Sequence, residues 1–292
     1  YVSEEVGMQP IDVDKQYHFF NPRAGVSYTL AERNNFYLSF AVAQKEPTRS
    51  DFTDRYKFAA DDTYPSSEKL YDWELGYQYT APRLSLGVNL YYMKYKDQLV
   101  PTGMVNDDSN ALNTNVPDSY RRGVELSASW RATGWFTVGA NATFSQNRIE
   151  NYVDALKDSP TYGKELGDMT IAYSPDVIAN AFLNFHHRGF EAVFHTQHVG
   201  KQYFTNNEND ALSLDAYCVT NLNLAYTFRT RTARSVRLGL LINNLFNAEY
   251  ESNGYGYSYM DTWSGPAPVR IDEAYYFPQA PLNVLANVTV KF

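Results

Sequence analysis

The segment from residue 249 to 274 holds the side chains best suited to bind a small molecule. Tyr255, Tyr257 and Tyr259 alternate with glycine and serine, and Trp263 and Arg270 follow them. Aromatic rings offer area for stacking, and an arginine offers paired hydrogen-bond donors to an anionic group. The same spacing fits a plainer alternative, in which the tyrosines extend a β-hairpin and pack on neighbouring loops. Both interpretations stay open at the level of the sequence.

Basic residues form a second candidate site between residues 46 and 67. Arg49 and Arg55, together with Lys57, could attract an anionic ligand. They alternate with aspartates, however, so a solvated loop of mixed charge competes with the binding interpretation. These aspartates are Asp51, Asp54, Asp61 and Asp62.

The other reactive side chains predict neither an enzyme nor a resident cofactor or metal. The chain has no Gly-x-Ser-x-Gly elbow and no His–Glu helix motif. His195 and His198 are three residues apart, which on a strand places them on opposite faces, so they cannot hold one ion together. Residues 106–110 offer oxygen ligands without the spacing of a defined calcium loop. The single cysteine, Cys218, excludes an internal disulfide.

The composition points to a membrane β-barrel. The chain has 292 residues, of which 44% are hydrophobic and 16% aromatic, yet no stretch approaches the roughly 18 apolar residues of a spanning helix. The mean hydropathy is -0.47. A barrel has this signature because only alternate residues meet lipid. The net charge of -8 argues against a nucleic-acid partner held through its phosphates.

Alternating apolar and polar residues define the expected strands. In residues 69–80, Tyr71, Trp73 and Leu75 share one face while Asp72 and Glu74 share the other. Pro82 ends this strand, and a very short turn leads to the next one at residues 84–92. The same unit of two strands and a tight turn recurs at residues 24–42, 120–144, 177–198 and 222–242.

Long polar connections separate these hairpins, so short turns collect at one end and long loops at the other. The long connections span residues 46–67, 96–117, 150–174, 204–213 and 249–274. Residues 282–292 alternate again and finish on Phe292, as the closing strand of an outer-membrane barrel does. We therefore predict an all-β fold, an antiparallel up-and-down transmembrane β-barrel to which this chain gives about eleven strands. An odd number leaves the barrel open, so the chain is expected to be part of a larger one.

Several segments resemble a known family. Residues 243–250, Asn-Asn-Leu-Phe-Asn-Ala-Glu-Tyr, are similar to the penultimate-strand signature of TonB-dependent outer-membrane receptors. Residues 276–281 are similar to the segment before the family's closing strand, although Ala280-Pro281 replaces the usual Gly-Arg. Arg122-Gly123-Val124-Glu125 resembles a recurrent strand start. Residues 19–25 and 46–52 resemble segments of such receptors from Bacteroidetes-like bacteria.

The resemblance implies a 22-stranded barrel with an N-terminal plug in the outer membrane of a Gram-negative bacterium. Residues 1–292 would then be the C-terminal part of the barrel, with residues 1–22 as an extracellular loop. The plug, the other barrel half and the region that contacts the TonB complex would precede Tyr1. The implied cargo is a scarce nutrient, with a ferric siderophore as our first expectation.

Two kinds of alternative remain at this stage. Haem or cobalamin could be the cargo, and His18 is the histidine best placed to meet haem from outside. Alternatively, residues 1–20 could supply a twelfth strand and close a small passive porin-like barrel. A soluble carbohydrate-binding or hydrolytic domain is contradicted by the apolar rows at Trp73 and at residues 84–90.

Overall fold

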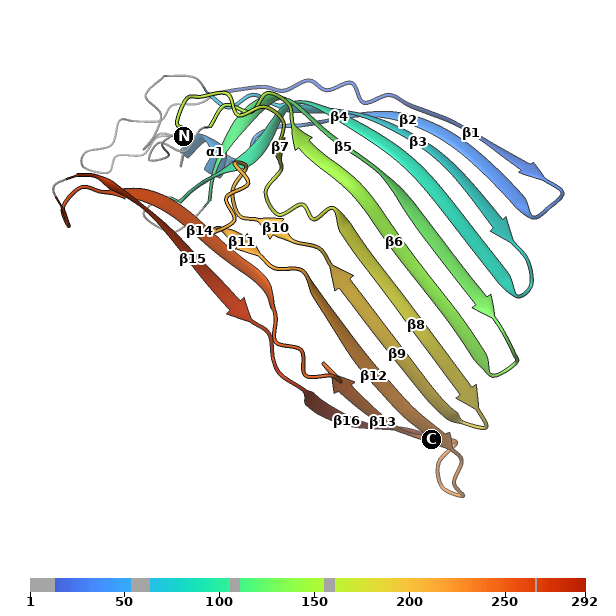
Figure 1. Cartoon of the computed structure of the whole chain (residues 1–292). Coiled ribbons are helices and arrows are strands. Elements are labelled where there is room, and N and C mark those ends of the chain that lie inside the picture. The colour runs from blue at the N-terminus through green and yellow to red at the C-terminus, as the bar shows by residue number, and fades with distance from the viewer. Residues whose placement is uncertain (1–13, 54–63, 106–110, 155–160, 266) are drawn as a thin grey trace.

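The computed structural model describes residues 14–53, 64–105, 111–154, 161–265 and 267–292. One curved antiparallel sheet dominates these residues and arches around an open side (Figure 1). Its edge strands are β1 and β16. In the described part of the chain, no helix is long and apolar enough to cross a membrane. The expected all-β, antiparallel architecture is confirmed, with eleven strands in the hydrogen-bonded path of the sheet.

The strands of this path follow one another in chain order. They are β1 (Arg23–Leu30), β2 (Asn34–Lys45), β3 (Glu68–Thr80), β4 (Leu84–Val105), β5 (Ala111–Arg131), β6 (Phe136–Ile149), β8 (Val177–His187), β9 (Phe190–Val199), β12 (Tyr217–Phe228), β13 (Ser235–Asn243) and β16 (Asn283–Lys291). The short β7 (Met169–Thr170) pairs with β6. Outside the sheet lie α1 (Arg49–Thr53) and two hairpins, β10 (Gln202–Tyr203) with β11 (Ser213–Leu214), and β14 (Glu251–Asp261) with β15 (Val269–Pro278).

Tight turns join the hairpins at one end of the sheet. Between β8 and β9 only Arg188 and Gly189 are unpaired, with φ of 49° and 87°. Positive φ at both central residues matches the right-handed twist of the flanking strands, which is why two-residue hairpins favour this geometry. The longer segments all lie at the other end (Figure 1).

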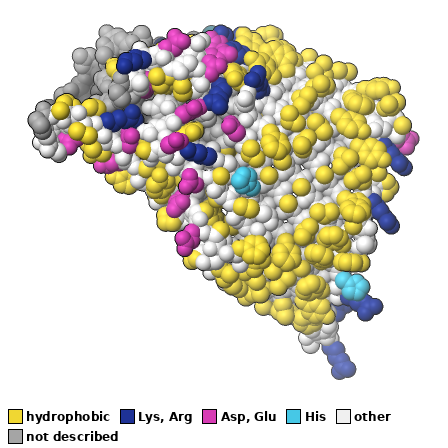
Figure 2. Space-filling model, viewed as in Figure 1, with side chains coloured by type: hydrophobic (Ala, Val, Ile, Leu, Met, Phe, Trp, Pro, Cys, Tyr) yellow, Lys and Arg dark blue, Asp and Glu magenta, His cyan; other side chains and the backbone are white. Residues whose placement is uncertain are grey.

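Alternation gives the sheet one apolar and one polar face. Across four strands the register places Leu38, Leu75, Leu90 and Val124 in one row. The adjacent row on the opposite face is Ser39, Glu74, Tyr91 and Gly123. The apolar side chains remain exposed, with Leu38 and Leu75 each 51% accessible. Figure 2 shows hydrophobic side chains in bands over these strands.

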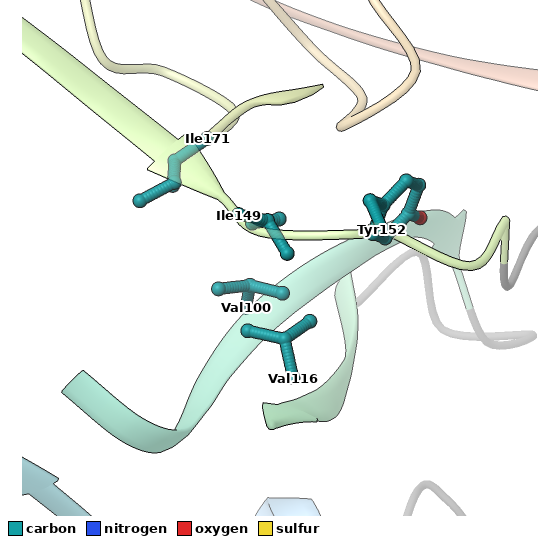
Figure 3. Packing of buried hydrophobic residues seen from close by; sticks show 5 residues of the cluster. All are labelled: Val100, Val116, Ile149, Tyr152 and Ile171. Atoms are coloured by element: carbon teal, nitrogen blue, oxygen red, sulfur yellow. The ribbon is translucent and has the colours of Figure 1, made fainter. Parts of the chain in front are cut away.

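The buried core lies at the long-loop end, beyond the single-layer sheet. One cluster joins the extended ends of β4, β5 and β6 to the β6–β8 connection (Figure 3), and consists of Val100, Val116, Ile149, Tyr152 and Ile171. A second cluster consists of Phe204, Leu212 and Leu214 on the β10–β11 hairpin. The described parts of these loops therefore pack as a layer with two hydrophobic clusters of its own.

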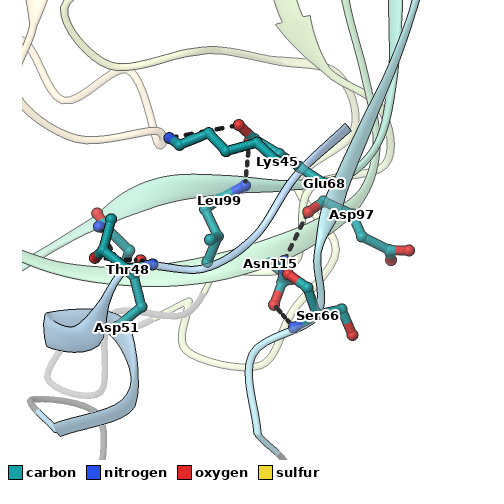
Figure 4. A network of polar contacts seen from close by, with 9 residues as sticks. Lys45, Thr48, Asp51, Ser66, Glu68, Asp97, Leu99 and Asn115 are labelled. Atoms are coloured by element: carbon teal, nitrogen blue, oxygen red, sulfur yellow. Dashed lines mark hydrogen bonds and ion pairs between the residues drawn. The ribbon is translucent and has the colours of Figure 1, made fainter. Parts of the chain in front are cut away.

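Polar contacts tie the β2–β3 connection to the same layer (Figure 4). The Asn115 side chain donates to the carbonyls of Ser66 and Asp97 at 3.1 and 2.6 Å, and its Oδ1 accepts from the Ser66 amide at 2.8 Å. Glu68 accepts from the Leu99 amide at 3.2 Å and pairs with Lys45. These bonds hold the ends of β2 to β5 together where they leave the apolar band.

The structure corrects the expected loop at residues 96–117. β4 and β5 continue to Val105 and from Ala111, with Gln98 paired to Val116 and Pro101 to Asn113. The polar composition of this segment hid the strand, whose alternate residues Val100 and Val116 enter the first cluster. Residues 249–274 likewise hold most of the hairpin of β14 and β15. The aspartate-rich tip at 106–110 lies outside the described residues.

Candidate functional site

The hairpin of β14 and β15 carries the first group of candidate ligand residues. Its register sets Tyr255 opposite Tyr275, and Tyr257 opposite Glu273. Because strand side chains alternate, Tyr255, Tyr257, Tyr259, Glu273 and Tyr275 share one side, which we call the Tyr255 face. The tyrosines therefore lie on a hairpin, as the plainer of the two interpretations of residues 249–274 has it, and their role in ligand binding stays a prediction.

Aromatic rings stack along the Tyr255 face. The ring centroids of Tyr255 and Tyr275 lie 5.0 Å apart, with an angle of 13° between the ring planes. Those of Tyr259 and Trp263 lie 6.3 Å apart, with an interplanar angle of 9°. Trp263, in the turn between the strands, is 75% exposed, and Tyr255 is 37% exposed. The face thus presents parallel rings to solvent, a geometry that suits stacking with a flat ligand.

One carboxylate organises these rings. Glu273 accepts hydrogen bonds from the hydroxyls of Tyr275, Tyr257 and Tyr259 at 2.8, 2.8 and 2.9 Å. These donors lower the pKa of Glu273 below its ordinary value. Conversely, hydrogen bonds with Tyr275 and Glu273 raise the pKa of Tyr257. Near neutral pH Glu273 is therefore ionised, while the Tyr257 hydroxyl keeps its proton.

The reverse side of the hairpin packs on the β10–β11 hairpin. This Gly256 face is made of Gly254, Gly256, Ser258, Arg270, Asp272 and Ala274. A Cβ on Gly254 would lie 2.8 Å from the Phe204 ring, and one on Gly256 would lie 2.8 Å from Leu212 Cδ2. Only glycine lets the hairpin approach the second cluster this closely.

Arg270 belongs to the Gly256 face and not to the tyrosines. Its Nε donates to Asp272 Oδ1 at 2.8 Å, and its Nη2 donates to Ser258 Oγ at 3.1 Å. Burial acts to raise the pKa of Asp272, but hydrogen bonds from Ser258 and the arginine charge lower it overall. The hairpin thus separates Arg270 from the aromatic residues that the sequence grouped with it.

The second candidate group lies on and after α1. Arg49 is exposed at the start of this helix, and Arg55 lies outside the described residues. Asp51 accepts from the Thr48 amide at 2.7 Å and from the Asn113 side chain at 2.9 Å. One of the surrounding carboxylates therefore caps the helix and docks it on β5.

Residues 201–214, which we call the strap, pack against the Gly256 face of the β14–β15 hairpin. Its buried Asn206 donates to the Pro101 carbonyl on β4 at 2.5 Å and accepts from the Ala172 amide at 2.8 Å. Its Glu208 pairs with Arg148 and accepts from the Thr170 amide at 3.0 Å. The strap therefore links the β14–β15 hairpin to the ends of β4 and β6.

Sequence reasoning missed Glu273, Tyr275 and the two supporting glycines. Glu273 and Tyr275 have the same parity, which an alternation analysis of residues 269–277 could have detected. Their partners on β14 depend on the hairpin register, which the pattern does not fix. Phe204 gave no signal, because its contact with the hairpin bridges distant segments.

The histidines are arranged as the strand geometry predicts. His195 pairs with Phe182 and Asn221 on the polar face, and His198 pairs with Ala179 and Cys218 on the apolar face. The described residues contain no group of three or more His, Cys, Asp or Glu side chains suited to hold a metal ion. The Tyr255 face can stack with rings, and its Glu273 can accept hydrogen bonds.

Solved structures share this fold. The chain superposes on the ferric yersiniabactin uptake receptor FyuA from Yersinia pestis with a TM-score of 0.64 and 19% identity, covering 92% of the chain and 37% of FyuA. The chain superposes on the ferric-catecholate import receptor Fiu from K12 E. coli with a TM-score of 0.64 and 19% identity, covering 96% of the chain and 36% of Fiu. For the copper transporter OprC the TM-score is 0.65 and the identity 20%, covering 91% of the chain and 38% of OprC. The chain thus spans little more than a third of each of these proteins.

The amino-acid sequence also matches a family model. The model of the TonB-dependent receptor-like β-barrel matches residues 4–245, most of the chain and nearly all of the main sheet. The antiparallel path in chain order, with short turns at one end and long loops at the other, fits part of such a barrel. The chain belongs to the TonB-dependent receptor family and carries part of its outer-membrane β-barrel.

Proposed function

We propose that the protein containing this chain imports an iron chelate across the outer membrane, and that the Tyr255 face contacts the chelate. The observation that carries this proposal is the exposed stack of rings on a hairpin anchored over the loop layer. FyuA and Fiu, which have this fold, are named for ferric chelates. Coupling to the TonB complex and a plug in the barrel belong to the same proposal.

The charges of the hairpin narrow the class of chelate. Glu273 is ionised at the centre of the Tyr255 face, while Asp272 and Ser258 hold Arg270 on the reverse face. A polyanionic chelate would meet a negative charge on this face without a nearby guanidinium. A chelate with flat rings and a neutral or positive net charge fits the face better.

The alternatives have less support. His18 is exposed in the segment before β1, and no second described feature points to haem. No described feature favours cobalamin over an iron chelate, and FyuA and Fiu are named for iron chelates. A passive porin-like barrel loses its basis, because the chain matches a receptor family. We propose no enzymatic role.

Growth and binding assays on the full-length receptor test this function. A deletion strain is expected to lose growth on an aromatic ferric chelate as sole iron source, while its use of haem and cobalamin is unchanged. Complementation with Tyr255→Ala/Trp263→Ala should weaken chelate binding by about tenfold or more, because each lost stacking pair contributes about 0.5–1.5 kcal/mol.

Tyr162→Ala is the matched control, since Tyr162 is an exposed tyrosine on a different loop. Its binding should equal that of the wild type at equal outer-membrane abundance. Unchanged growth of the deletion strain on every iron chelate would overturn the import proposal. Unchanged affinity of the double variant would remove only the Tyr255 face from the site.

A further inference from the structure

Basic side chains gather at the short-turn end of the sheet. We call the basic rim the set of such residues in or beside the tight turns: Arg33, Arg83, Arg131, Arg188, Arg229, Arg231, Arg234 and Lys291. All of them are exposed. Glu32 is the one acidic residue within these turns, and Glu191, just beyond a turn, is paired with Arg237. This excess of positive charge stands out in a chain whose net charge is -8.

The charges of the basic rim are not neutralised within the described part of the chain. None of its eight side chains forms an ion pair with a described carboxylate. At the long-loop end, by contrast, several basic side chains form ion pairs with carboxylates. Examples are Lys45 with Glu68, Lys94 with Asp118, Arg148 with Glu208, and Lys201 with Asp210. The two ends therefore differ in the charge they offer to an outside partner.

The basic rim lies just outside a belt of aromatic residues. Tyr28, Trp130 and Tyr226 project from the apolar face within a few residues of the turns and are 62%, 52% and 48% exposed. The Trp135 ring, beside the same edge, stacks on Phe185 at 6.1 Å. Aromatic belts mark the boundary between hydrocarbon and headgroups, and long basic side chains extend from there into the headgroup layer. Figure 2 shows basic side chains at the edge where the hydrophobic bands end.

We propose that the basic rim binds the phosphates of anionic phospholipids in the leaflet that meets the short turns. In outer-membrane barrels this leaflet faces the periplasm. An arginine can bind a phosphate through two parallel hydrogen bonds, and seven of the eight rim residues are arginines. This contact fixes the depth of the barrel and selects its neighbouring lipids.

The distribution of the charges favours lipid over a soluble acidic partner. The rim residues occupy five successive turns and the end of β16, so they follow the whole edge of the sheet. A compact partner would need charges that converge on one patch. A layer of headgroups meets every turn at the same depth, which is how these residues are arranged.

Lipid selectivity in nanodiscs tests the proposal. The full-length receptor would be placed in phosphatidylcholine discs that contain spin-labelled phosphatidylglycerol. The association constant of phosphatidylglycerol with the receptor, relative to that of phosphatidylcholine, would be measured at low and at high salt. The wild type should prefer phosphatidylglycerol by about fivefold for each rim charge that contacts a headgroup. High salt should reduce that preference. Arg229→Gln/Arg231→Gln/Arg234→Gln should lose most of the preference contributed by the β12–β13 turn.

Two further variants keep the test decisive. Arg229→Lys/Arg231→Lys/Arg234→Lys retains the charge and should retain most of the preference, which separates charge from misfolding. Lys45→Gln/Lys96→Gln/Lys201→Gln removes three charges from the other end and should leave the selectivity unchanged. Equal association of both lipids with the wild type would overturn the proposal. So would binding of acidic peptidoglycan fragments by the rim without lipid selectivity. Neither readout depends on the cargo, so the import proposal stands or fails separately.

Discussion

The Phe204 ring occupies the space where a side chain on Gly256 would otherwise lie. A Cβ at Gly256 would be 3.0 Å from Phe204 Cδ2 and 2.9 Å from the Glu273 carbonyl oxygen. Close packing of β14 on the second cluster therefore requires glycine at this position. Through this contact the strap fixes the position of the aromatic hairpin.

Gly256→Val should displace the hairpin without unfolding the barrel. Overpacking of this kind costs about 1–3 kcal/mol, and the loss falls on the contact with Phe204 and Leu212. We expect faster proteolysis within residues 249–274 and weaker chelate binding at normal outer-membrane abundance. Gly134→Ala is the control, because nothing lies within 4 Å of a Cβ there. Equal protease resistance of the two variants would contradict this packing.

Acidification should loosen the Tyr255 face. Three tyrosine hydroxyls lower the pKa of Glu273, so its stabilising effect is complete above the ordinary glutamate pKa of about 4.3 and is lost as the pH falls through the lowered value. Trp263 fluorescence, isolated by replacing the other tryptophans, should therefore change in this acid range. Glu273→Gln should abolish the transition, and a transition that persists in this variant must come from another group.

Glu208→Gln should release the strap. Burial acts to raise the pKa of Glu208, but hydrogen bonds from Thr170 and the charge of Arg148 lower it overall, so the anion is the bound form. Hydrogen bonds to a charged group contribute about 1.5–3 kcal/mol, reduced here because the side chain is partly exposed. Hydrogen exchange of residues 201–214 should accelerate severalfold. Asp215→Asn, which changes an exposed carboxylate close to the strap, should leave exchange unchanged.

An arginine on the apolar face should impair insertion into the membrane. Leu75 lies between Leu38 and Leu90 in the middle of the apolar row, where arginine costs about 2–4 kcal/mol in a barrel. Leu75→Arg should lower the folded receptor in outer-membrane fractions, as judged by heat-dependent gel mobility. Gln78→Arg, on the polar face of the same strand, should leave that level near the wild type. A reversed order would mean that the two faces are assigned the wrong way round.

Local pattern was sufficient for the strands across the apolar band and for the contrast between the two ends. Residues 69–92 fold as the alternation and Pro82 predict, in β3, a short turn and β4. Pattern failed at residues 96–117, because extended pairing beyond the apolar band needs no strong alternation. It also failed to separate Arg270 from the tyrosines, because their faces follow from the register of β15 on β14.

The sequence by itself determined that alternate side chains form an apolar and a polar face, since strand periodicity is a property of neighbouring residues. It also carried the family resemblance that the barrel match confirmed. Only the tertiary structure decided which rings meet Glu273, and that Asn206 joins the strap to Pro101. Such contacts join segments far apart in the chain, and their geometry depends on the packing of the whole loop layer.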